Sequence, residues 1–261
     1  MNNSLNYDYW YNVWRNSKES SACIVRVTNK CDQQCRHCAF RSSPYNTGQI
    51  SIDNCAKINK WLPEKIVMNI MGGEFSILHD YESILIALSQ YRLKVGIVTN
   101  GFWSKNKHEI SRFISTIKTI TKTCNEVIVC VANDQWHKKY PQTESLLRKN
   151  KLDIEIQIKE ELPIHKIVRI GRAWDNKINK STSNHQSCRI MSNLTIIENG
   201  MITRCPYGYF PWRHFTETSW YDAQEYIWGW RSEKLSEGMT CSLCMECDYA
   251  NTQNTIDSNN I

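Results

Sequence analysis

Cys31, Cys35 and Cys38 stand close together in the stretch "NKCDQQCRHCAF" (residues 29–40), and no fourth cysteine lies nearby in the sequence. Zinc ions and iron–sulfur clusters normally take four protein ligands. Three thiolates can hold three irons of a [4Fe–4S] cube and leave the fourth iron open to a ligand that reacts. A zinc ion completed by His37 is the alternative, although zinc sites usually contain paired C-x2-C units.

A second group of cysteines lies near the end of the sequence. Cys205 ends a predicted hairpin, "NLTIIENGMITRC" (193–205), whose Asn199-Gly200 pair suits a two-residue turn and returns the chain toward Cys188. Two groups of soft ligands in one chain suggest two metal centres, with a structural zinc knuckle as the alternative for the late group. That late group is Cys188, Cys205, Cys241, Cys244 and Cys247.

Strand-like and helix-like patterns alternate from residue 22 to about residue 175. A helix is predicted over residues 51–63, where Ser51 can cap the start, and two more have apolar faces within residues 81–91 and 110–120. This alternation predicts an α/β protein with a parallel sheet covered by helices. The predicted strands are residues 22–28, 65–71, 94–101, 126–134, 152–158 and 166–173.

Polar segments directly follow four of these strands. In parallel sheets of this kind, ligands bind at the carboxyl ends of the strands. The segments are therefore expected to converge on one site. They are the cysteine loop, Gly72-Gly73-Glu74, Thr99-Asn100-Gly101 and "NDQWH" (133–137).

The sequence resembles the radical S-adenosylmethionine (SAM) superfamily at three points over about residues 20–175. The first is the C-x3-C-x-Φ-C pattern after the first strand, where Φ is usually aromatic and is His37 here. The second is a Gly-Gly-Glu motif after the second strand, followed by Phe75 where the family often has proline. The third is the "TNG" segment at residues 99–101.

This resemblance implies a partial (β/α)6 TIM-like barrel in which Cys31, Cys35 and Cys38 hold the catalytic [4Fe–4S] cluster. The amino and carboxylate groups of SAM would then chelate the open iron. Gly72 and Gly73 would let the backbone approach the ligand, and the carboxylate of Glu74 would meet the SAM ammonium group.

Three further residues are expected to contact the ribose or the methionine part of SAM: Thr99, Asn100 and Asp134. Capping of strand ends is the alternative for each of them. His137 and Arg172 also lie at predicted strand ends, where a surface or capping role is expected.

The late cysteines resemble the SPASM/twitch extension of the same superfamily. Cys188-x11-Gly200-x4-Cys205 matches its opening, and the remaining three cysteines are fewer than the full SPASM pattern requires. The resemblance implies the shorter twitch type with one auxiliary [4Fe–4S] cluster. Its ligands would be Cys188, Cys205, Cys241 and Cys244, with Cys247 as a fifth candidate that could replace either of the last two.

The same patterns predict how the chain is divided. We expect an N-terminal extension (1–20), a core (21–175), a linker (176–187), a cluster domain (188–250) and a disordered tail (251–261). Cys55 and Cys130 are expected to be buried apolar thiols. The aromatic run at residues 207–230 is expected to pack the small domain, with a cover over the barrel formed by its tryptophans as the alternative.

Charge and hydropathy argue against a nucleic-acid-binding protein, a secreted protein and a membrane protein. The net charge of +6 comes from scattered Lys and Arg residues, which favours a solvated surface over a nucleic-acid site. The sequence contains neither a signal peptide nor a run of about 18 apolar residues that would cross a membrane. It therefore predicts a cytoplasmic protein.

Membership of this superfamily implies reductive cleavage of SAM to a 5′-deoxyadenosyl radical that abstracts hydrogen from a substrate. The expected substrate is a peptide or a small natural product, and the expected outcome an oxidation or a cross-link, with a flavodoxin- or ferredoxin-type electron donor. Because only about thirty residues precede the cysteine loop, no fused leader-peptide-binding domain is expected. Alternatives are an epimerase with a thiol hydrogen donor such as Cys247, a sugar or cyclitol dehydrogenase, and a non-enzymatic iron–sulfur or zinc-binding regulator.

Overall fold

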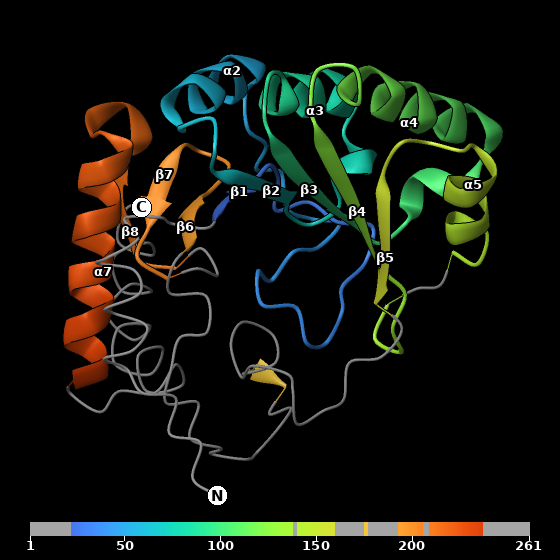
Figure 1. Ribbon diagram of the computed structural model, residues 1–261. Coiled ribbons are helices and arrows are strands. Elements are labelled where there is room, and N and C mark those ends of the chain that lie inside the picture. Colours follow the sequence, from blue (N-terminus) through green and yellow to red (C-terminus); the bar gives the residue numbers. More distant parts are fainter. Residues whose placement is uncertain (1–21, 138–139, 160–174, 177–192, 206–208, 237–261) are drawn as a thin grey trace, which may run out of the picture.

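Strands alternate with helices from Ala22 onward, as Figure 1 shows for this computed structural model. The first five strands are β1 (Ala22–Arg26), β2 (Val67–Met71), β3 (Lys94–Thr99), β4 (Glu126–Ala132) and β5 (Glu155–Lys159). The helices among them are α2 (Ile52–Trp61), α3 (Tyr81–Ser89), α4 (Lys107–Ile120) and α5 (Thr143–Lys149). The structure describes residues 22–137, 140–159, 175–176, 193–205 and 209–236.

These five strands pair in parallel in the order of the sequence. They belong to an eight-stranded sheet of order β5-β4-β3-β2-β1-β6-β7-β8. Helices α2, α3 and α4 cover one face of the sheet (Figure 1). The prediction of an α/β fold of the partial-barrel type is therefore confirmed, while the predicted strand at residues 166–173 lies outside the described residues.

The local sequence explains where helix α2 begins and ends. The side chain of Ser51 accepts a hydrogen bond from the backbone N–H of Asn54 (3.1 Å), and Asp53 lies in the first turn, where a negative charge is favoured. The helix ends before Pro63, which cannot continue its hydrogen bonding. The predicted cap is confirmed.

The two faces of the sheet differ in burial, because alternate residues of a strand point to opposite sides. Met68 and Ile70 of β2 and Val129 of β4 belong to the hydrophobic core that the helices share. Met71 and Cys130 point to the other side and line a cavity. The helix-covered face thus stabilises the sheet and leaves the opposite face open for a site.

The predicted hairpin is present and joins the same sheet. β6 (Asn193–Ile196) pairs in parallel with β1 and antiparallel with β7 (Met201–Thr203). β8 (Pro211–His214) pairs with β7 at the edge of the sheet. The hairpin therefore lies directly beside the strand that leads into the cysteine loop.

The turn of this hairpin differs from the prediction. Gly200 N–H donates to Ile197 O (2.8 Å), and Ile197 N–H donates to Met201 O (3.0 Å), so the loop contains three residues rather than two. Only Gly200 adopts a left-handed conformation (φ +84°), whereas a two-residue type I′ turn would also require one at Asn199. Gly200 lies at the end of a three-residue loop, where this conformation is required.

The aromatic run packs the end of the described chain onto the sheet. Helix α7 (Trp220–Ser236) follows β8 and the short 3-10 helix η4 (Phe215–Glu217). Trp61 of α2 lies edge-on to Trp220 (5.4 Å between ring centroids) and donates a hydrogen bond to Thr218 O (2.7 Å). The packing role predicted for this run is confirmed for Trp220 and for Trp228, which are 3% and 4% exposed.

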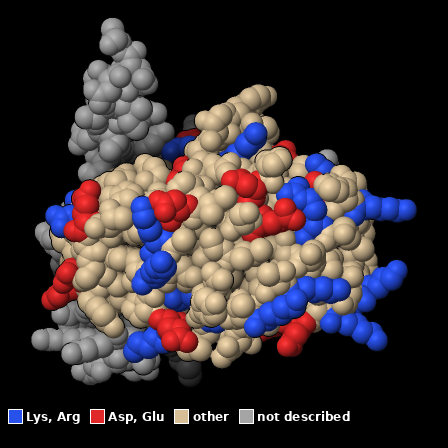
Figure 2. Space-filling model, turned by 90° about the horizontal axis from the view of Figure 1, so that it is seen from above, with Lys and Arg blue, Asp and Glu red and all other residues tan. Residues whose placement is uncertain are grey.

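Charged side chains of both signs cover the helical layer. Figure 2, which looks onto this layer, shows Lys and Arg side chains interspersed with Asp and Glu side chains. Several form ion pairs, including Arg112 with Glu82 (2.9 Å) and Lys57 with Asp53 (2.6 Å). In the described part of the chain, no helix combines the length and the apolar character needed to cross a membrane.

We predict that buried hydrogen bonds of Arg92 stabilise the fold. The residue is 2% exposed. Its guanidinium donates hydrogen bonds to the carbonyls of Leu62, Pro63 and Ile66 (3.0, 2.6 and 2.5 Å). Arg92→Leu should lower the free energy of unfolding by about 3 kcal/mol or more, because three carbonyls lose a charged donor. Urea denaturation measures this, and the exposed control Arg148→Leu should change stability by no more than about 0.5 kcal/mol. Equal effects of the two substitutions would contradict the prediction.

Candidate active site

The loop that carries the three cysteines leaves β1 and lies on the side of the sheet opposite the helices (Figure 1, blue). Val27 N–H donates to Met71 O (2.8 Å), which extends the pairing of β1 with β2 beyond the strand. Farther along, Cys31 N–H donates to Ser43 O (3.0 Å), and Cys38 N–H donates to Cys35 O (3.1 Å). Backbone hydrogen bonds therefore fix the shape of a loop that contains no helix and no long strand.

Gly72 and Gly73 allow β2 to continue against this loop. Gly73 N–H donates to Thr28 O (2.8 Å), and Glu74 N–H donates to Lys30 O (2.9 Å). A Cβ atom on Gly72 would lie 2.5 Å from Thr28 O, and one on Gly73 would overlap Lys30 O. The sequence suggests that these glycines let the backbone approach a ligand. In the structure they let it approach the backbone of the cysteine loop.

The side chain of Glu74 points into the protein and is 0% exposed. Its carboxylate accepts hydrogen bonds from Ser76 Oγ (2.6 Å), Thr99 Oγ1 (2.9 Å) and Asn100 N–H (2.7 Å). Burial raises the pKa of Glu74 to about 7, although these hydrogen bonds oppose the shift. Glu74 thus holds the end of β3 against the end of β2, and its expected contact with the SAM ammonium group stays a prediction.

A cavity of about 360 Å³ opens at the carboxyl ends of the strands. Most of the residues that the sequence assigns to the site line this cavity. Glu74 and Asp134 are not among the lining residues and are both fully buried behind them. The predicted site residues that do line it are Cys31, Cys35, Cys38, Gly72, Gly73, Thr99 and Asn100.

The three thiols suit an iron–sulfur cluster better than a zinc ion. A single zinc ion with bonds of about 2.3 Å holds its sulfur ligands about 3.8 Å apart. Among the described residues, the three sulfurs do not lie within 4.8 Å of one another as a group. Burial raises the pKa of the Cys31 thiol well above its ordinary value, so thiolate ligation there needs the positive charge of a metal centre.

A comparison with known families supports this assignment. Residues 25–122 match the sequence profile of the Radical SAM superfamily. The matched segment begins in β1, ends just after α4, and includes the cysteine loop and the Gly72-Gly73 contact. This stretch, which is less than half of the chain, is similar to the radical SAM superfamily.

Individual relatives match parts of the chain. The putative peptide biosynthesis protein YydG of Bacillus subtilis is 20% identical over 126 residues, which cover 47% of this chain and 38% of YydG. The antilisterial bacteriocin subtilosin biosynthesis protein AlbA of Bacillus subtilis is 32% identical over 77 residues, 29% of this chain and 17% of AlbA. The alignments thus span well under half of each relative. The crystal structure of Streptococcus suis SuiB bound to the precursor peptide SuiA covers 88% of this chain and 73% of SuiB, with 16% identity and a TM-score of 0.41.

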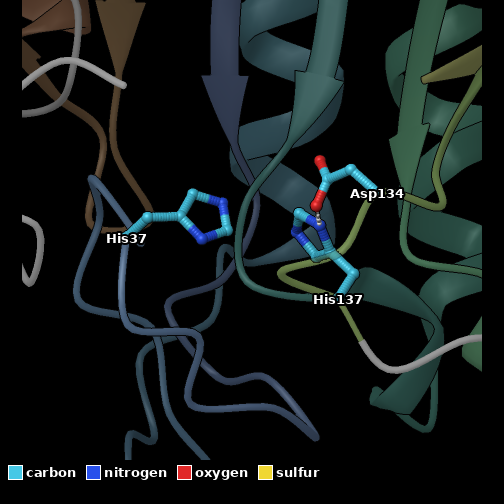
Figure 3. Close-up of side chains that lie close together, drawn as sticks. All are labelled: His37, Asp134 and His137. Atoms are coloured by element: carbon cyan, nitrogen blue, oxygen red, sulfur yellow. Dashed lines mark hydrogen bonds and ion pairs between the residues drawn. The ribbon is translucent and has the colours of Figure 1, made fainter. Parts of the chain in front are cut away.

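Beside the radical SAM motifs, two segments meet at the wall of the cavity. His137 and Asp134 come from the loop after β4, and His37 comes from the cysteine loop (Figure 3). Asp134 Oδ1 lies 2.7 Å from His137 Nδ1, and the His37 and His137 rings meet edge to face with centroids 5.1 Å apart. Burial raises the pKa of Asp134, but the hydrogen bonds to His137 and Trp136 N–H and the electrostatic interactions with His137 and His37 together outweigh it, so the pKa lies below the usual range.

The position of His137 corrects one expectation and bears on another. A surface or capping role is expected for His137, but its side chain lines the cavity, and Arg172 lies outside the described residues. His37 lies against Trp136 (5.6 Å between ring centroids) and His137. This placement does not favour His37 as the fourth ligand of a zinc ion with the three cysteines.

Sequence reasoning missed several residues in and around this cavity. Asp32 accepts hydrogen bonds from Asn100 Nδ2 (2.7 Å) and from the Tyr140 hydroxyl (2.8 Å), which ties the cysteine loop to two other segments. Cys130, expected to be a buried apolar thiol, lines the cavity together with Lys159. The alternation in "EVIVCVA" and "LDIEIQIK" places both residues on the open face of the sheet, and that pattern could have revealed them.

Tyr209 links Cys205 to the cysteine loop through two hydrogen bonds. Cys205 N–H donates to Tyr209 O (3.1 Å), and the Tyr209 hydroxyl donates to Ala39 O (2.7 Å), one residue after Cys38. Arg41 forms an ion pair with Asp175 (2.9 Å) on the same side of the loop. The other proposed auxiliary ligands, Cys188, Cys241, Cys244 and Cys247, lie outside the described residues.

We predict that Gly73→Ala prevents the loop from holding a cluster. The added Cβ would force apart the backbones at Gly73 and Lys30, so reconstituted protein should lose about four irons per chain. Gly229→Ala is the matched control, because nothing lies within 4 Å of a Cβ at this position in α7. That variant should keep its iron and gain up to about 1 kcal/mol of stability. Iron analysis and urea denaturation measure both, and full iron retention in Gly73→Ala would contradict the assignment.

We predict that Glu74 makes the stability of the cluster-free protein depend on pH. The pKa of Glu74 is about 7 in the folded state, compared with an ordinary value of 4.5. Between these pH values the folded state therefore binds more protons than the unfolded state. The free energy of unfolding should therefore fall as the pH rises from about 4.5 to about 7. Glu74→Gln should remove this part of the dependence, and the exposed control Glu64→Gln should not. Urea denaturation at several pH values measures the slopes, and equal slopes for wild type and Glu74→Gln would refute the effect.

Proposed function

We propose that this chain is a radical SAM enzyme whose catalytic [4Fe–4S] cluster is held by Cys31, Cys35 and Cys38. The observation that carries the proposal is that these thiols share one cavity with the Gly72-Gly73 backbone and with Thr99 and Asn100, all within or beside the matched radical SAM segment. When bound, the cluster and SAM supply a 5′-deoxyadenosyl radical that abstracts a hydrogen atom from the substrate.

The protein's own groups position the ligands in this proposal. Gly72 and Gly73 offer backbone groups at the cavity wall, and Glu74 keeps Thr99 and Asn100 in place from behind it. Contacts of Glu74 with the SAM ammonium group, and of Thr99, Asn100 and Asp134 with its ribose or methionine part, belong to the same proposal. Apolar side chains of the inner face, Met71 and Val98 among them, limit the access of water to the site.

The substrate that we propose is a peptide. Support comes from the names of the relatives, which describe peptide biosynthesis for YydG and bacteriocin biosynthesis for AlbA. A small natural product such as a sugar or cyclitol is the alternative substrate, and a flavodoxin- or ferredoxin-type protein is the proposed electron donor.

An auxiliary cluster in the twitch-like segment is part of the proposed mechanism. Its ligands would be Cys188, Cys205, Cys241 and Cys244, with Cys247 as a replacement for either of the last two. Its role would be to accept an electron from the substrate radical, giving an oxidation or a cross-link. Support comes from Tyr209, whose carbonyl accepts a hydrogen bond from Cys205 N–H and whose hydroxyl donates one to the carbonyl of Ala39, next to Cys38. A net two-electron oxidation needs such an acceptor, because the second electron must leave the substrate radical.

A specific observation favours epimerisation as a second candidate. Cys130 places a thiol on the wall of the same cavity, and its Sγ lies 3.2 Å from Gln157 Oε1. A thiol there can return a hydrogen atom to a substrate radical, the role for which the sequence suggested Cys247. Product made in deuterated water separates the two candidates: epimerisation incorporates deuterium at the abstracted carbon, and oxidation does not.

We predict that anaerobically reconstituted protein holds about eight irons per chain, two [4Fe–4S] clusters, and cleaves SAM under dithionite. Replacement of Cys31, Cys35 and Cys38 together by Ala should remove about four irons and abolish SAM cleavage. The control Cys55→Ala should retain both, because Cys55 is buried in α2 away from the cavity. Iron analysis and chromatography of 5′-deoxyadenosine measure the result. Iron-loaded protein without SAM cleavage would instead support a non-enzymatic regulator.

A further inference from the structure

Three potential metal ligands from two separate segments meet at the edge of the cavity. Figure 3 shows His37 extending from the cysteine loop toward the loop after β4, which carries Asp134 and His137. One ligand atom of each residue lies within 4.8 Å of the other two. Both histidines also line the cavity.

The carboxylate of Asp134 has one oxygen atom that accepts no hydrogen bond from the described residues. Asp134 is 0% exposed; its Oδ1 bonds to His137 Nδ1 (2.7 Å) and to Trp136 N–H (3.0 Å). Its Oδ2 is buried and has no hydrogen-bond partner among the described residues. A buried carboxylate oxygen without a partner costs free energy that a hydrogen bond or a bound cation would offset. The site therefore contains an unused acceptor next to two imidazoles.

The distances suit a metal ion after a small movement. Bonds from zinc to imidazole nitrogen or carboxylate oxygen are about 2.0–2.2 Å, so neighbouring ligand atoms around one ion lie roughly 3–3.5 Å apart. Ligand atoms that already lie within 4.8 Å need to move by only about 1 Å each. Two imidazoles and one carboxylate are ligands for zinc and for non-haem iron(II), whereas magnesium and calcium prefer oxygen ligands.

We propose that His37, Asp134 and His137 bind one divalent transition-metal ion of the zinc or iron(II) class at the wall of the cavity. The ion is distinct from any cluster held by the three cysteines, because its ligands are nitrogen and oxygen atoms. Three protein ligands leave at least one coordination position open. Since both histidines line the cavity, that position faces it and is available to water or to a carboxylate or carbonyl oxygen of a bound molecule.

Zinc binding by the reconstituted, iron-loaded protein tests the proposal. The protein is equilibrated with a series of zinc concentrations, separated from free zinc by dialysis, and analysed for zinc and iron together. Wild type should bind one zinc ion per chain that Asp134→Asn and His137→Gln each bind at least about tenfold more weakly. Both variants should keep the wild-type iron content. His108→Gln, which changes an exposed histidine in the first turn of α4, is the matched control and should bind zinc as wild type does.

Two variants at different residues keep the test valid if one of them fails to fold, which circular dichroism and the iron content would reveal. Equal zinc affinity in wild type and in a folded Asp134→Asn or His137→Gln variant would overturn the proposal, as would the absence of zinc binding by wild type. Zinc uptake that is matched by loss of iron would also overturn it, because the zinc would then occupy the cysteine loop. Because Asp134 is also a proposed contact of SAM, SAM cleavage is compared with wild type in the His137→Gln variant. Its iron content and SAM cleavage report on the radical SAM function and its zinc affinity on the metal site, so failure of one proposal is distinguishable from failure of the other.

Discussion

The close contact between two backbone segments, residues 28–30 and residues 72–74, is the constraint on which the site depends. It continues the pairing of β1 with β2 past the ends of both strands, through the hydrogen bonds from Gly73 to Thr28 and from Glu74 to Lys30. At Gly72 and Gly73 this contact leaves no space for a side chain larger than hydrogen. The first cysteine follows Lys30 directly, so its position is set by the sheet rather than by the loop alone.

The same contact determines where the Glu74 carboxylate lies. Because the backbone N–H of Glu74 is bonded to the cysteine loop, its side chain turns inward and accepts hydrogen bonds from Ser76, Thr99 and Asn100. Asn100 in turn donates from its side chain to Asp32, which lies next to Cys31. The ends of β1, β2 and β3 are thus joined in a closed ring of hydrogen bonds. The burial of a carboxylate opposes the stability of this ring, and the several donors around it offset that cost.

The five parallel strands, the helices α2, α3 and α4 and their order could be predicted from the sequence because period-2 and period-3.6 patterns alternate clearly there, whereas α5, α7 and β8 were not predicted. Convergence of the polar segments followed from the parallel arrangement alone. The directions of individual side chains could not be predicted in this way. Glu74 faces inward because donors at the end of β3 bind its carboxylate. Cys130 is half-exposed because the face of the sheet opposite the helices is open. The three-residue turn at Gly200 depends on the pairing of Ile197 with Met201, which the Asn-Gly signal does not reveal. The contact of His37 with the loop after β4 joins segments about a hundred residues apart and has no local pattern.

The hydrophobic core shows that folding and cofactor loading use different parts of the molecule. The core contains the thiols of Cys23, Cys55 and Cys124, while none of the three loop cysteines belongs to it among the described residues. Strand β1 is buried along its whole length between two parallel neighbours, yet the loop that leaves it is held mainly by hydrogen bonds at its base and along its own backbone. Local opening of such a segment requires far less free energy than opening of the core. In the proposed function, the finished sheet would therefore serve as a template that receives iron and sulfide after folding and that keeps its structure when they are lost.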